Sequence, residues 1–386
     1  MIPYGCHDID QTDIDEVVKI LKSSFLTQGD TVPEFETRVA EHCGAKHAVA
    51  VNSATSALHI ACLSLGVSSG DRVWTSPISF VASSNAALYC GASVDFVDID
   101  PNTYNLSADK LRDKLEQAKQ TNSLPKVVIP VHLCGQSCEM AAIHQLSEEY
   151  GFHIIEDASH AIGGKYQGMP IGGGQYSDIT IFSFHPVKII TTGEGGMALT
   201  NNPVLAEKMQ LFRSHGITRD PGLMKHKPHG EWYYEQIDLG FNYRLTDIQA
   251  ALGVSQLKRL DKFVSKRNEL ANRYTDLLSE LPVITPFVLS DAYSSYHLYV
   301  IRIDHEHTTT TRESVFSTLR ENGIGVNIHY IPIYKQPYYQ GLGFSEGYCE
   351  IAEQYYKYAI TLPLYPALTE QQQDQVVEML KTALNI

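Results

Sequence analysis

The chain has 386 residues, a formal net charge of −14 at pH 7, 43% hydrophobic residues and 19% charged residues. This composition is typical of a folded globular protein and argues against disorder, and the length predicts two domains. The negative charge argues against nucleic acid as a partner. No apolar run reaches the ~20 residues that a membrane span needs.

The seven cysteines show no regular spacing, which predicts reduced thiols in a cytoplasmic protein. The first residues lack a basic segment followed by an apolar one, so we expect no secretion signal. The sixteen histidines are scattered without a ligand spacing, and no metal site is expected.

Between about residues 45 and 200, short apolar runs alternate with helical patterns. This alternation predicts a mostly parallel sheet covered by helices. Ligands of such sheets bind at the carboxyl ends of the strands. The expected strands are 48–51, 73–75, 94–97, 126–131, 153–156 and 181–184.

From residue 202 the sequence is mainly helical, with a polar loop at about 217–237 and a helix that begins near Thr246. After about residue 260 the pattern changes and predicts a smaller α+β domain. Its expected elements are a strand at 296–303, a helix at 312–322, a strand at 325–330 and a final helix at 369–384. We therefore predict a large domain of residues 1–258 and a small domain of residues 259–386, with a segment of about 1–14 packing on the small domain.

Lys188 follows the apolar run at 181–184 and precedes a stretch of small residues and glycines at 191–196. A single lysine at such a place is usually a surface residue. Its amine would have a chemical use if it formed a Schiff base with an aldehyde cofactor such as pyridoxal phosphate. The rest of the sequence must then provide the other parts of a cofactor site.

A phosphate site is predicted where the strand at 48–51 meets the next helix. The segment Asn52 to Ala57 places hydroxyl side chains and free backbone N–H groups at the start of that helix. Helix capping alone would also explain these residues. We expect Thr55 and Ser56 to bind a phosphate, with Ser183 reaching in from a neighbouring strand.

Two further motifs at strand ends complete the predicted site. Asp157 closes the strand at 153–156, and its carboxylate could hold a proton on a pyridine nitrogen. His160 could pack near the cofactor ring, and Phe80 could stack on it. Each motif alone is also compatible with a structural role. Their conjunction at the ends of one sheet favours a pyridoxal phosphate site.

With these motifs, the chain resembles the DegT/DnrJ/EryC1/StrS sugar aminotransferases, which are fold-type I pyridoxal phosphate enzymes. The resemblance covers nearly the whole chain, and its most specific parts are the S-x-H-x-x-K motif that ends at Lys188 and the N-Y-R-L-T-D-I-Q-A motif at 242–250. Other matching stretches are 26–29, 52–57, 76–82, 156–161, 212–216 and 297–299. It implies a seven-stranded, mostly parallel sheet in the large domain and a smaller C-terminal domain.

The resemblance also implies residue roles. Lys188 and Asp157 would be catalytic, and Asp157 would contact the pyridine nitrogen. The other cofactor ligands would be Thr55, Ser56, Phe80, His160, Ser183 and, from the other subunit, Asn242. The enzyme would be an obligate homodimer with shared active sites. We expect Arg213, His215, His329 and Tyr330 to contact substrate.

Within the family, the stretches at 75–82, 213–217 and 326–334 are most similar to the branch that acts in pseudaminic acid biosynthesis. This similarity implies transfer of an amino group from L-glutamate to C4 of a UDP-linked 4-keto-6-deoxy-N-acetylhexosamine. Two alternatives remain open: an aminotransferase for another nucleotide-linked keto sugar, of the dTDP-4-keto or 3-keto type, and an idle regulatory protein that binds the cofactor. A related branch of dehydratases has histidine in place of the lysine, so the intact Lys188 disfavours dehydration.

Overall fold

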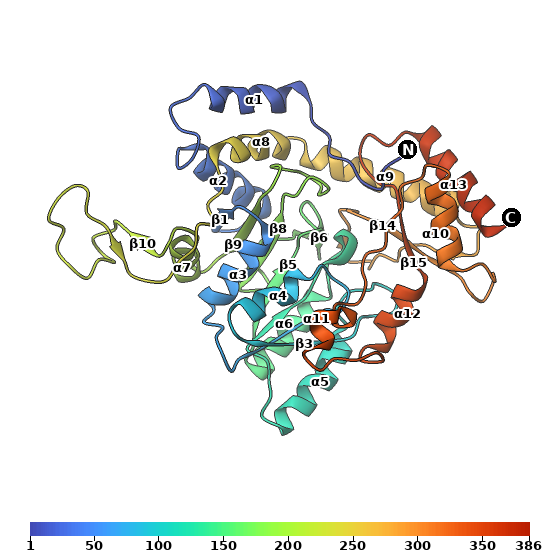
Figure 1. Ribbon diagram of the computed structural model, residues 1–386, viewed down its shortest axis with the longest axis horizontal. Coiled ribbons are helices and arrows are strands. Elements are labelled where there is room, and N and C mark those ends of the chain that lie inside the picture. The colour runs from blue at the N-terminus through green and yellow to red at the C-terminus, as the bar shows by residue number, and fades with distance from the viewer.

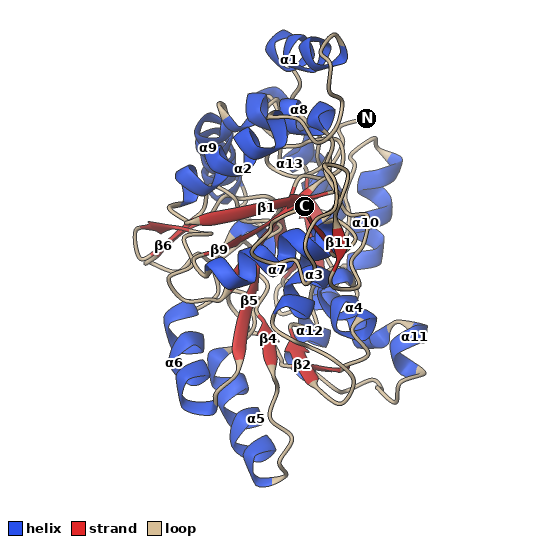
Figure 2. Ribbon diagram, turned by 90° about the vertical axis from the view of Figure 1, so that its left-hand side faces the viewer, coloured by secondary structure: helices blue, strands red, loops and turns tan.

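The computed structural model describes residues 1 to 386, and its centre is a sheet covered by helices on both faces (Figure 1 and Figure 2). The seven strands have the order β1-β9-β8-β5-β4-β2-β3. Only β9 runs against its neighbours, and the remaining pairs are parallel. The predicted α/β fold with a mostly parallel seven-stranded sheet is confirmed. The strands are β1 (His47–Val51), β2 (Arg72–Thr75), β3 (Ser93–Phe96), β4 (Val127–Ile129), β5 (His153–Asp157), β8 (Ile179–Ser183) and β9 (Gly196–Thr200).

Alternate residues of each strand face opposite helix layers, because successive side chains of a strand point to opposite faces. Val49 and Val51 pack in one core with α3, α4 and α7, whereas Ala48 and Ala50 pack in another with α2 and α8. A third core joins α5 and α6 to the second face. The helices are α2 (Thr31–Cys43), α3 (Ala54–Ser64), α4 (Ala82–Tyr89), α5 (Ala108–Gln120), α6 (Met140–Tyr150), α7 (Pro203–Arg213) and α8 (Asp247–Leu257).

The C-terminal third has an apolar core of its own, built around the three-stranded sheet β12-β14-β15. Only Lys258 and Arg259 separate α8 from the helix that enters this region. Division of the chain into domains at residue 258 stays a prediction. The elements are α9 (Leu260–Leu277), β12 (Val283–Ile284), β14 (Tyr299–Ile303), α10 (Arg312–Glu321), α11 (Pro337–Gln340), α12 (Glu350–Tyr358), β15 (Ala359–Leu362) and α13 (Glu370–Leu384).

The N-terminal segment contacts both parts of the chain. The Ile2 N–H donates to the carbonyl of Gly323 at 2.8 Å, and the Leu364 N–H donates to the carbonyl of Tyr4 at 3.1 Å. Helix α1 (Gln11–Leu21) lies instead along α8 (Figure 1). The first four residues therefore pack on the C-terminal core, and the helix that follows packs on the large sheet's helices.

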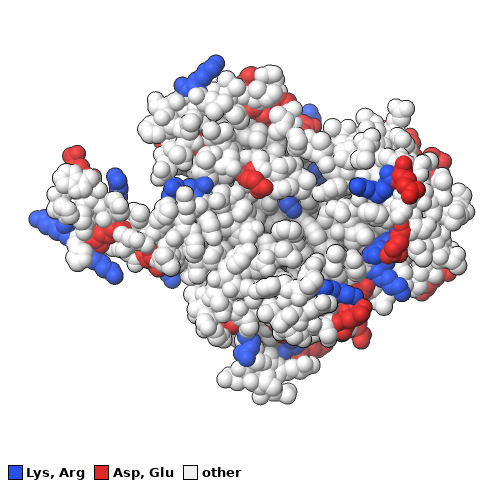
Figure 3. Space-filling model, viewed as in Figure 1, with Lys and Arg blue, Asp and Glu red and all other residues white.

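The predicted loop at 217–237 is an arm that projects from the body of the molecule (Figure 1). A two-stranded pair, β10 (Ile217–Thr218) and β11 (Glu235–Gln236), closes its base. Figure 3 shows basic and acidic side chains interspersed both on the arm and over the visible face of the body. A separate small sheet joins β6 (Lys165–Tyr166), β7 (Met169–Pro170) and β13 (Ala292–Tyr293).

The expected strand at 325–330 is wrong. The segment makes one isolated bridge, between Asn327 and Thr361, in place of a ladder. The Asn327 side chain accepts from the Ile328 N–H at 2.9 Å, which turns the backbone away from strand pairing. Four consecutive residues of the segment, 327–330, line a cavity instead. None of the helices has the length and apolar content that a membrane span requires.

Asp247 connects two motifs that are far apart in the sequence. Its buried carboxylate accepts the N–H of Gly29 at 2.7 Å, of Thr31 at 3.1 Å and of Val32 at 3.0 Å. These donors lie at and just before the start of α2, where N–H groups lack intrahelical partners. Asp247, from the motif at 242–250, thus fixes the loop that contains the matching stretch 26–29.

Replacing Asp247 should therefore destabilise the fold. Asp247→Ala removes a charged acceptor from three backbone donors and should lower the free energy of unfolding by about 3 kcal/mol. Asp261→Ala is the matched control, because Asp261 is exposed and its side chain forms no hydrogen bond; its effect should stay within about 0.5 kcal/mol. Urea unfolding measures both, and equal stability of the two variants would contradict the role of Asp247.

Candidate active site

A cavity of about 800 Å³ opens at the carboxyl ends of the central strands. This volume falls in the usual range for small-molecule sites, and the position is the one expected for ligands of a parallel sheet. Nine residues predicted from the sequence line it: Thr55, Ser56, Phe80, Asp157, His160, Ser183, Lys188, His329 and Tyr330.

The start of α3 forms one wall of the cavity. Ser53 caps the helix by accepting the Ser56 N–H at 3.1 Å, and the Ser56 hydroxyl donates to Asn52 Oδ1 at 2.7 Å. The N–H groups of Ala54 and Thr55 have no intrahelical acceptor and remain available to an anion. Gly196 of β9 allows this close packing, because a Cβ there would lie 2.4 Å from the Ala54 nitrogen.

Lys188 lies in a loop that its own side chains hold. The Thr191 hydroxyl donates to the Phe184 carbonyl at 2.9 Å and accepts the Gly193 N–H at 2.9 Å. The Thr192 hydroxyl donates to the Glu194 carbonyl at 2.7 Å. The small residues after Lys188 therefore build a fixed turn that aims the lysine at the cavity.

The Lys188 side chain lines the cavity, and its amine is buried among the surrounding protein atoms. Burial lowers the pKa of this amine to about 8, and the negative charge of Asp157 opposes part of that shift. About a tenth of the amine is then uncharged at pH 7. An uncharged amine can act as a nucleophile or take up a proton.

The buried carboxylate of Asp157 is held by serine side chains on both of its oxygens. Oδ1 accepts from the Ser159 hydroxyl at 2.6 Å and from the Ser159 N–H at 3.2 Å. Oδ2 accepts from the Ser83 hydroxyl at 2.6 Å. These three hydrogen bonds fix the orientation of the carboxylate in the cavity.

Three histidines lie together at the inner end of the cavity. His160 Nδ1 accepts the Cys134 N–H at 3.3 Å, so its proton is on Nε2, 3.2 Å from the Tyr330 hydroxyl. The His160 and His297 rings are 4.4 Å apart. Burial and the nearby Lys188 lower the pKa of His160 and His297 well below the usual value, and that of His329 to about 3. All three are therefore neutral at pH 7.

Phe80 lies at the rim of the cavity with 61% of its surface exposed. An aromatic side chain left this open is available to stack on a ligand. Asn242 is exposed and does not line the cavity of its own chain, although the neighbouring Tyr243 carbonyl accepts the Asn52 N–H at 2.8 Å.

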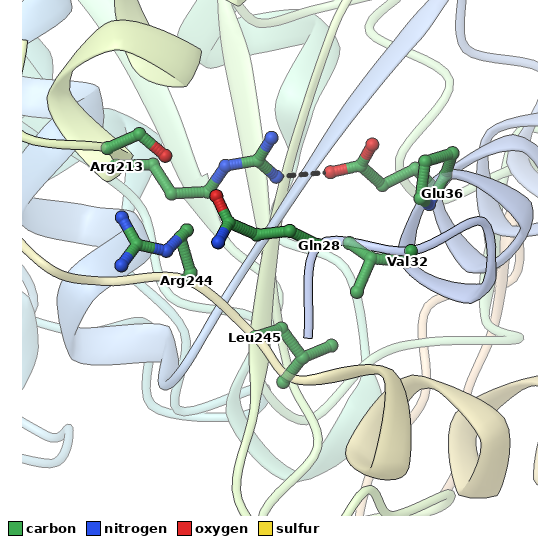
Figure 4. A pocket seen from close by; sticks show the side chains of 9 residues that line it. Gln28, Val32, Glu36, Arg213, Arg244 and Leu245 are labelled. Carbon is green, nitrogen blue, oxygen red and sulfur yellow. Dashed lines mark hydrogen bonds and ion pairs between the residues drawn. The ribbon is translucent and has the colours of Figure 1, made fainter. Parts of the chain in front are cut away.

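Arg213 and His215 also lie outside this cavity, contrary to the expected contact with a substrate there. Figure 4 shows Arg213 in a second, smaller pocket of about 220 Å³, facing Glu36. Its guanidinium donates to Glu36 Oε1 at 2.5 Å and to the Ala50 carbonyl at 2.9 Å, so its charge is already paired. His215 is exposed beyond the end of α7. The guanidinium of Arg244, in the same pocket, forms no hydrogen bond or ion pair.

Several lining residues were not predicted. Asn52 and Ser53 directly precede the predicted phosphate residues, so the capping pattern itself could have identified them. His297 begins the matching stretch 297–299, which could have identified it, whereas Tyr4 comes from a distant segment without a local signal. The other polar lining residues that were not predicted are Ser79, Ser159, His185, Glu194 and Asn327.

Comparisons with known proteins identify the family of this chain. A profile of the DegT/DnrJ/EryC1/StrS aminotransferase family matches residues 7–381. The spore coat polysaccharide biosynthesis protein SpsC of Bacillus subtilis is 39% identical over 383 residues, which cover 98% of this chain and 96% of that protein. The UDP-4-amino-4,6-dideoxy-N-acetyl-beta-L-altrosamine transaminase of Campylobacter jejuni is 40% identical over 366 residues, which cover 95% and 93%.

Among solved structures, PseC of Helicobacter pylori, described as an aminotransferase involved in the biosynthesis of pseudoaminic acid, matches with a TM-score of 0.89 and 33% identity over 100% of this chain and 99% of PseC. The predicted family is thereby confirmed. This chain belongs to the DegT/DnrJ/EryC1/StrS family of sugar aminotransferases, whose cofactor is pyridoxal phosphate.

Proposed function

We propose that the protein transfers an amino group from L-glutamate to C4 of a UDP-linked 4-keto-6-deoxy-N-acetylhexosamine, in the biosynthesis of pseudaminic acid or a related surface glycan. The observation that carries this proposal is that the Lys188 amine and the Asp157 carboxylate line the same cavity of a sugar aminotransferase. The choice of a UDP sugar rests on the likeness to the Campylobacter jejuni transaminase and to PseC.

The residues of the cavity fit pyridoxal phosphate. The start of α3 offers two free N–H groups and the hydroxyl of Thr55 to a phosphate, and Ser56 and Ser183 lie in the same cavity. Asp157 offers an ionised carboxylate to the ring nitrogen, and Phe80 offers an open aromatic face. The partly uncharged amine of Lys188 suits attachment of an aldehyde.

Pyridoxal phosphate, when bound, supplies a carbonyl that exchanges amino groups and a ring that stores an electron pair. With the cofactor bound, Lys188 Nζ would take the proton from the donor's Cα and return it to the former aldehyde carbon of the cofactor, because its lowered pKa lets it act as base and then as acid. Asp157 holds a proton at the ring nitrogen while negative charge develops. His160 donates its Nε2 proton to the Tyr330 hydroxyl, and this pair fixes the wall that faces the substrates.

The substrate side is assigned to His329 and Tyr330, which line the cavity opposite the phosphate wall. Both side chains are uncharged at pH 7, so they suit the hydroxyl and amide groups of a sugar. Arg213 is assigned a structural role, since its Nη1 donates to Glu36 and to the Ala50 carbonyl. His215 has no assigned contact within its own chain.

A homodimer is part of the proposal, because one chain does not provide the cations that the substrates need. The cavity is lined by one lysine, Lys188, and by no arginine, whereas the cofactor and a nucleotide sugar carry several phosphates. Asn242 is exposed, Arg244 is unpaired in the second pocket, and the projecting arm exposes the apolar surface of Trp232 and Tyr234. A second copy of the chain would cover the arm and bring Asn242 to the phosphate of its partner's site. We place this dimer in the cytoplasm.

The lowered pKa of Lys188 predicts how apoprotein should take up the cofactor. Only the uncharged amine condenses with an aldehyde, so the rate of visible-absorbance development should rise with pH through a midpoint of about 8. A stopped-flow series from pH 6 to pH 10 measures it, with Lys188→Ala as the control that develops no absorbance. A midpoint near the ordinary lysine value would contradict the buried amine.

The reaction itself is tested with a panel of keto sugars and glutamate, read by 2-oxoglutarate release. The UDP-4-keto-6-deoxy-N-acetylhexosamine should be the preferred acceptor, and Lys188→Ala should lose at least about 10⁴-fold in rate. Preference for a dTDP-linked or 3-keto sugar would replace the UDP assignment with the first alternative. If glutamate leaves the visible absorbance of the bound cofactor unchanged, the protein is the idle alternative.

The shared site is tested by complementation. Lys188→Ala and Asn242→Ala chains should each be impaired, but a co-expressed mixture should recover about a quarter of the wild-type sites, because half of the dimers are mixed and each mixed dimer holds one intact site. Activity of the purified mixture against each parent gives the result. A mixture no more active than its parents would show that Asn242 serves its own chain.

A further inference from the structure

We infer that Ser83 is a positioning residue that keeps Asp157 ionised and aimed at the cofactor ring, an inference that rests on the role proposed above for Asp157. Ser83 is fully buried in the first turn of α4, on a different segment from the motif that contains Asp157. Its hydroxyl lies 2.6 Å from Asp157 Oδ2. The two residues are 74 positions apart, so the fold and not the local sequence brings them together.

The direction of the hydrogen bonds follows from the acceptor. An ionised carboxylate only accepts, so the single proton of the Ser83 hydroxyl points to Asp157. The Ser79 hydroxyl, 2.7 Å from Ser83 Oγ and also buried, must then donate to Ser83. The result is a one-way chain from Ser79 through Ser83 to Asp157.

This chain limits what else Asp157 can bind. A carboxylate has about four acceptor positions. Ser159 occupies two of them through its hydroxyl and its N–H, and Ser83 occupies a third. One position is left for a donor from the cavity, and the three other bonds fix its direction.

The hydrogen bond from Ser83 also affects whether the proton between Asp157 and the ring nitrogen lies on the carboxylate or on the ring. Hydrogen bonds between oxygens at this distance, with one partner charged, are strong and favour the ionised form of the acceptor. Ser83 therefore lowers the affinity of Asp157 for a proton and leaves that proton on the ring nitrogen. Without Ser83, the carboxylate should gain a proton at higher pH and release the cofactor there.

The test compares three variants of the holoenzyme in the absence of any substrate. The dissociation constant of pyridoxal phosphate is measured from pH 8 down to pH 4. Ser83→Ala should move the acid midpoint of cofactor loss upward by about one pH unit, which is the expected effect of one charge-assisted hydrogen bond. Ser79→Ala removes only the donor to Ser83, so it should give a smaller shift in the same direction and provides the test if Ser83→Ala fails to fold.

Ser84→Ala is the matched control. Ser84 is the next residue of the same helix and equally buried, but its hydroxyl bonds the Tyr339 hydroxyl at 2.5 Å and not Asp157. Its acid midpoint should equal that of the wild type. Nitrogen NMR of cofactor labelled at the ring nitrogen gives a second readout: the signal should move toward the unprotonated position in Ser83→Ala and stay in place in Ser84→Ala.

An unchanged midpoint and nitrogen signal in Ser83→Ala, or an equal shift in Ser84→Ala, would overturn the inference. The readouts use no sugar, so failure of every keto sugar in the panel would overturn the proposed reaction and leave the Ser83 result standing. A wild-type protein that binds no cofactor would overturn both.

Discussion

The register between β5 and β8 is the constraint on which the site depends. The two strands are parallel neighbours, and Asp157 pairs in register with Ile181. The carboxylate that ends β5 therefore lies beside the strand that ends at Ser183 and continues to Lys188. A shift of one residue would turn every side chain of a strand to the opposite face. The apolar side chains of β8, which pack on both faces of the sheet, therefore help to fix this register and with it the relative positions of Asp157 and Lys188.

Part of what identifies this family in the sequence is structural. Asp247 belongs to the most specific motif of the chain, yet its carboxylate binds the backbone of 29–32 and never reaches the cavity. Arg213, in another matching stretch, is tied to Glu36 and Ala50. A matching residue therefore need not be a catalytic one, and the contacts decide which it is.

The sequence predicted the parts of the site that follow strands directly. Thr55, Asp157 and Lys188 each stand just after an apolar run, where the rule for parallel sheets applies. Tyr4, Ser83 and His297 could not be predicted in this way, because distant contacts bring them to the cavity or to Asp157. The segment at 325–330 misled because its residues 327–330 line the cavity, and the segment forms one isolated bridge in place of a ladder.

The whole chain has sixteen histidines, but the three that lie together in the cavity carry no charge at neutral pH. Burial holds the pKa of His160, His297 and His329 far below neutrality, while burial raises the pKa of the Cys134 thiol to about 12. Among these three histidines, the Cys134 thiol and Lys188, only the Lys188 amine has a pKa near physiological pH. Three neutral rings also add no positive charge that would lower the pKa of the lysine further, as charged rings would. The wall of histidines therefore supplies shape and hydrogen-bonding groups, and it leaves the movement of protons to Lys188.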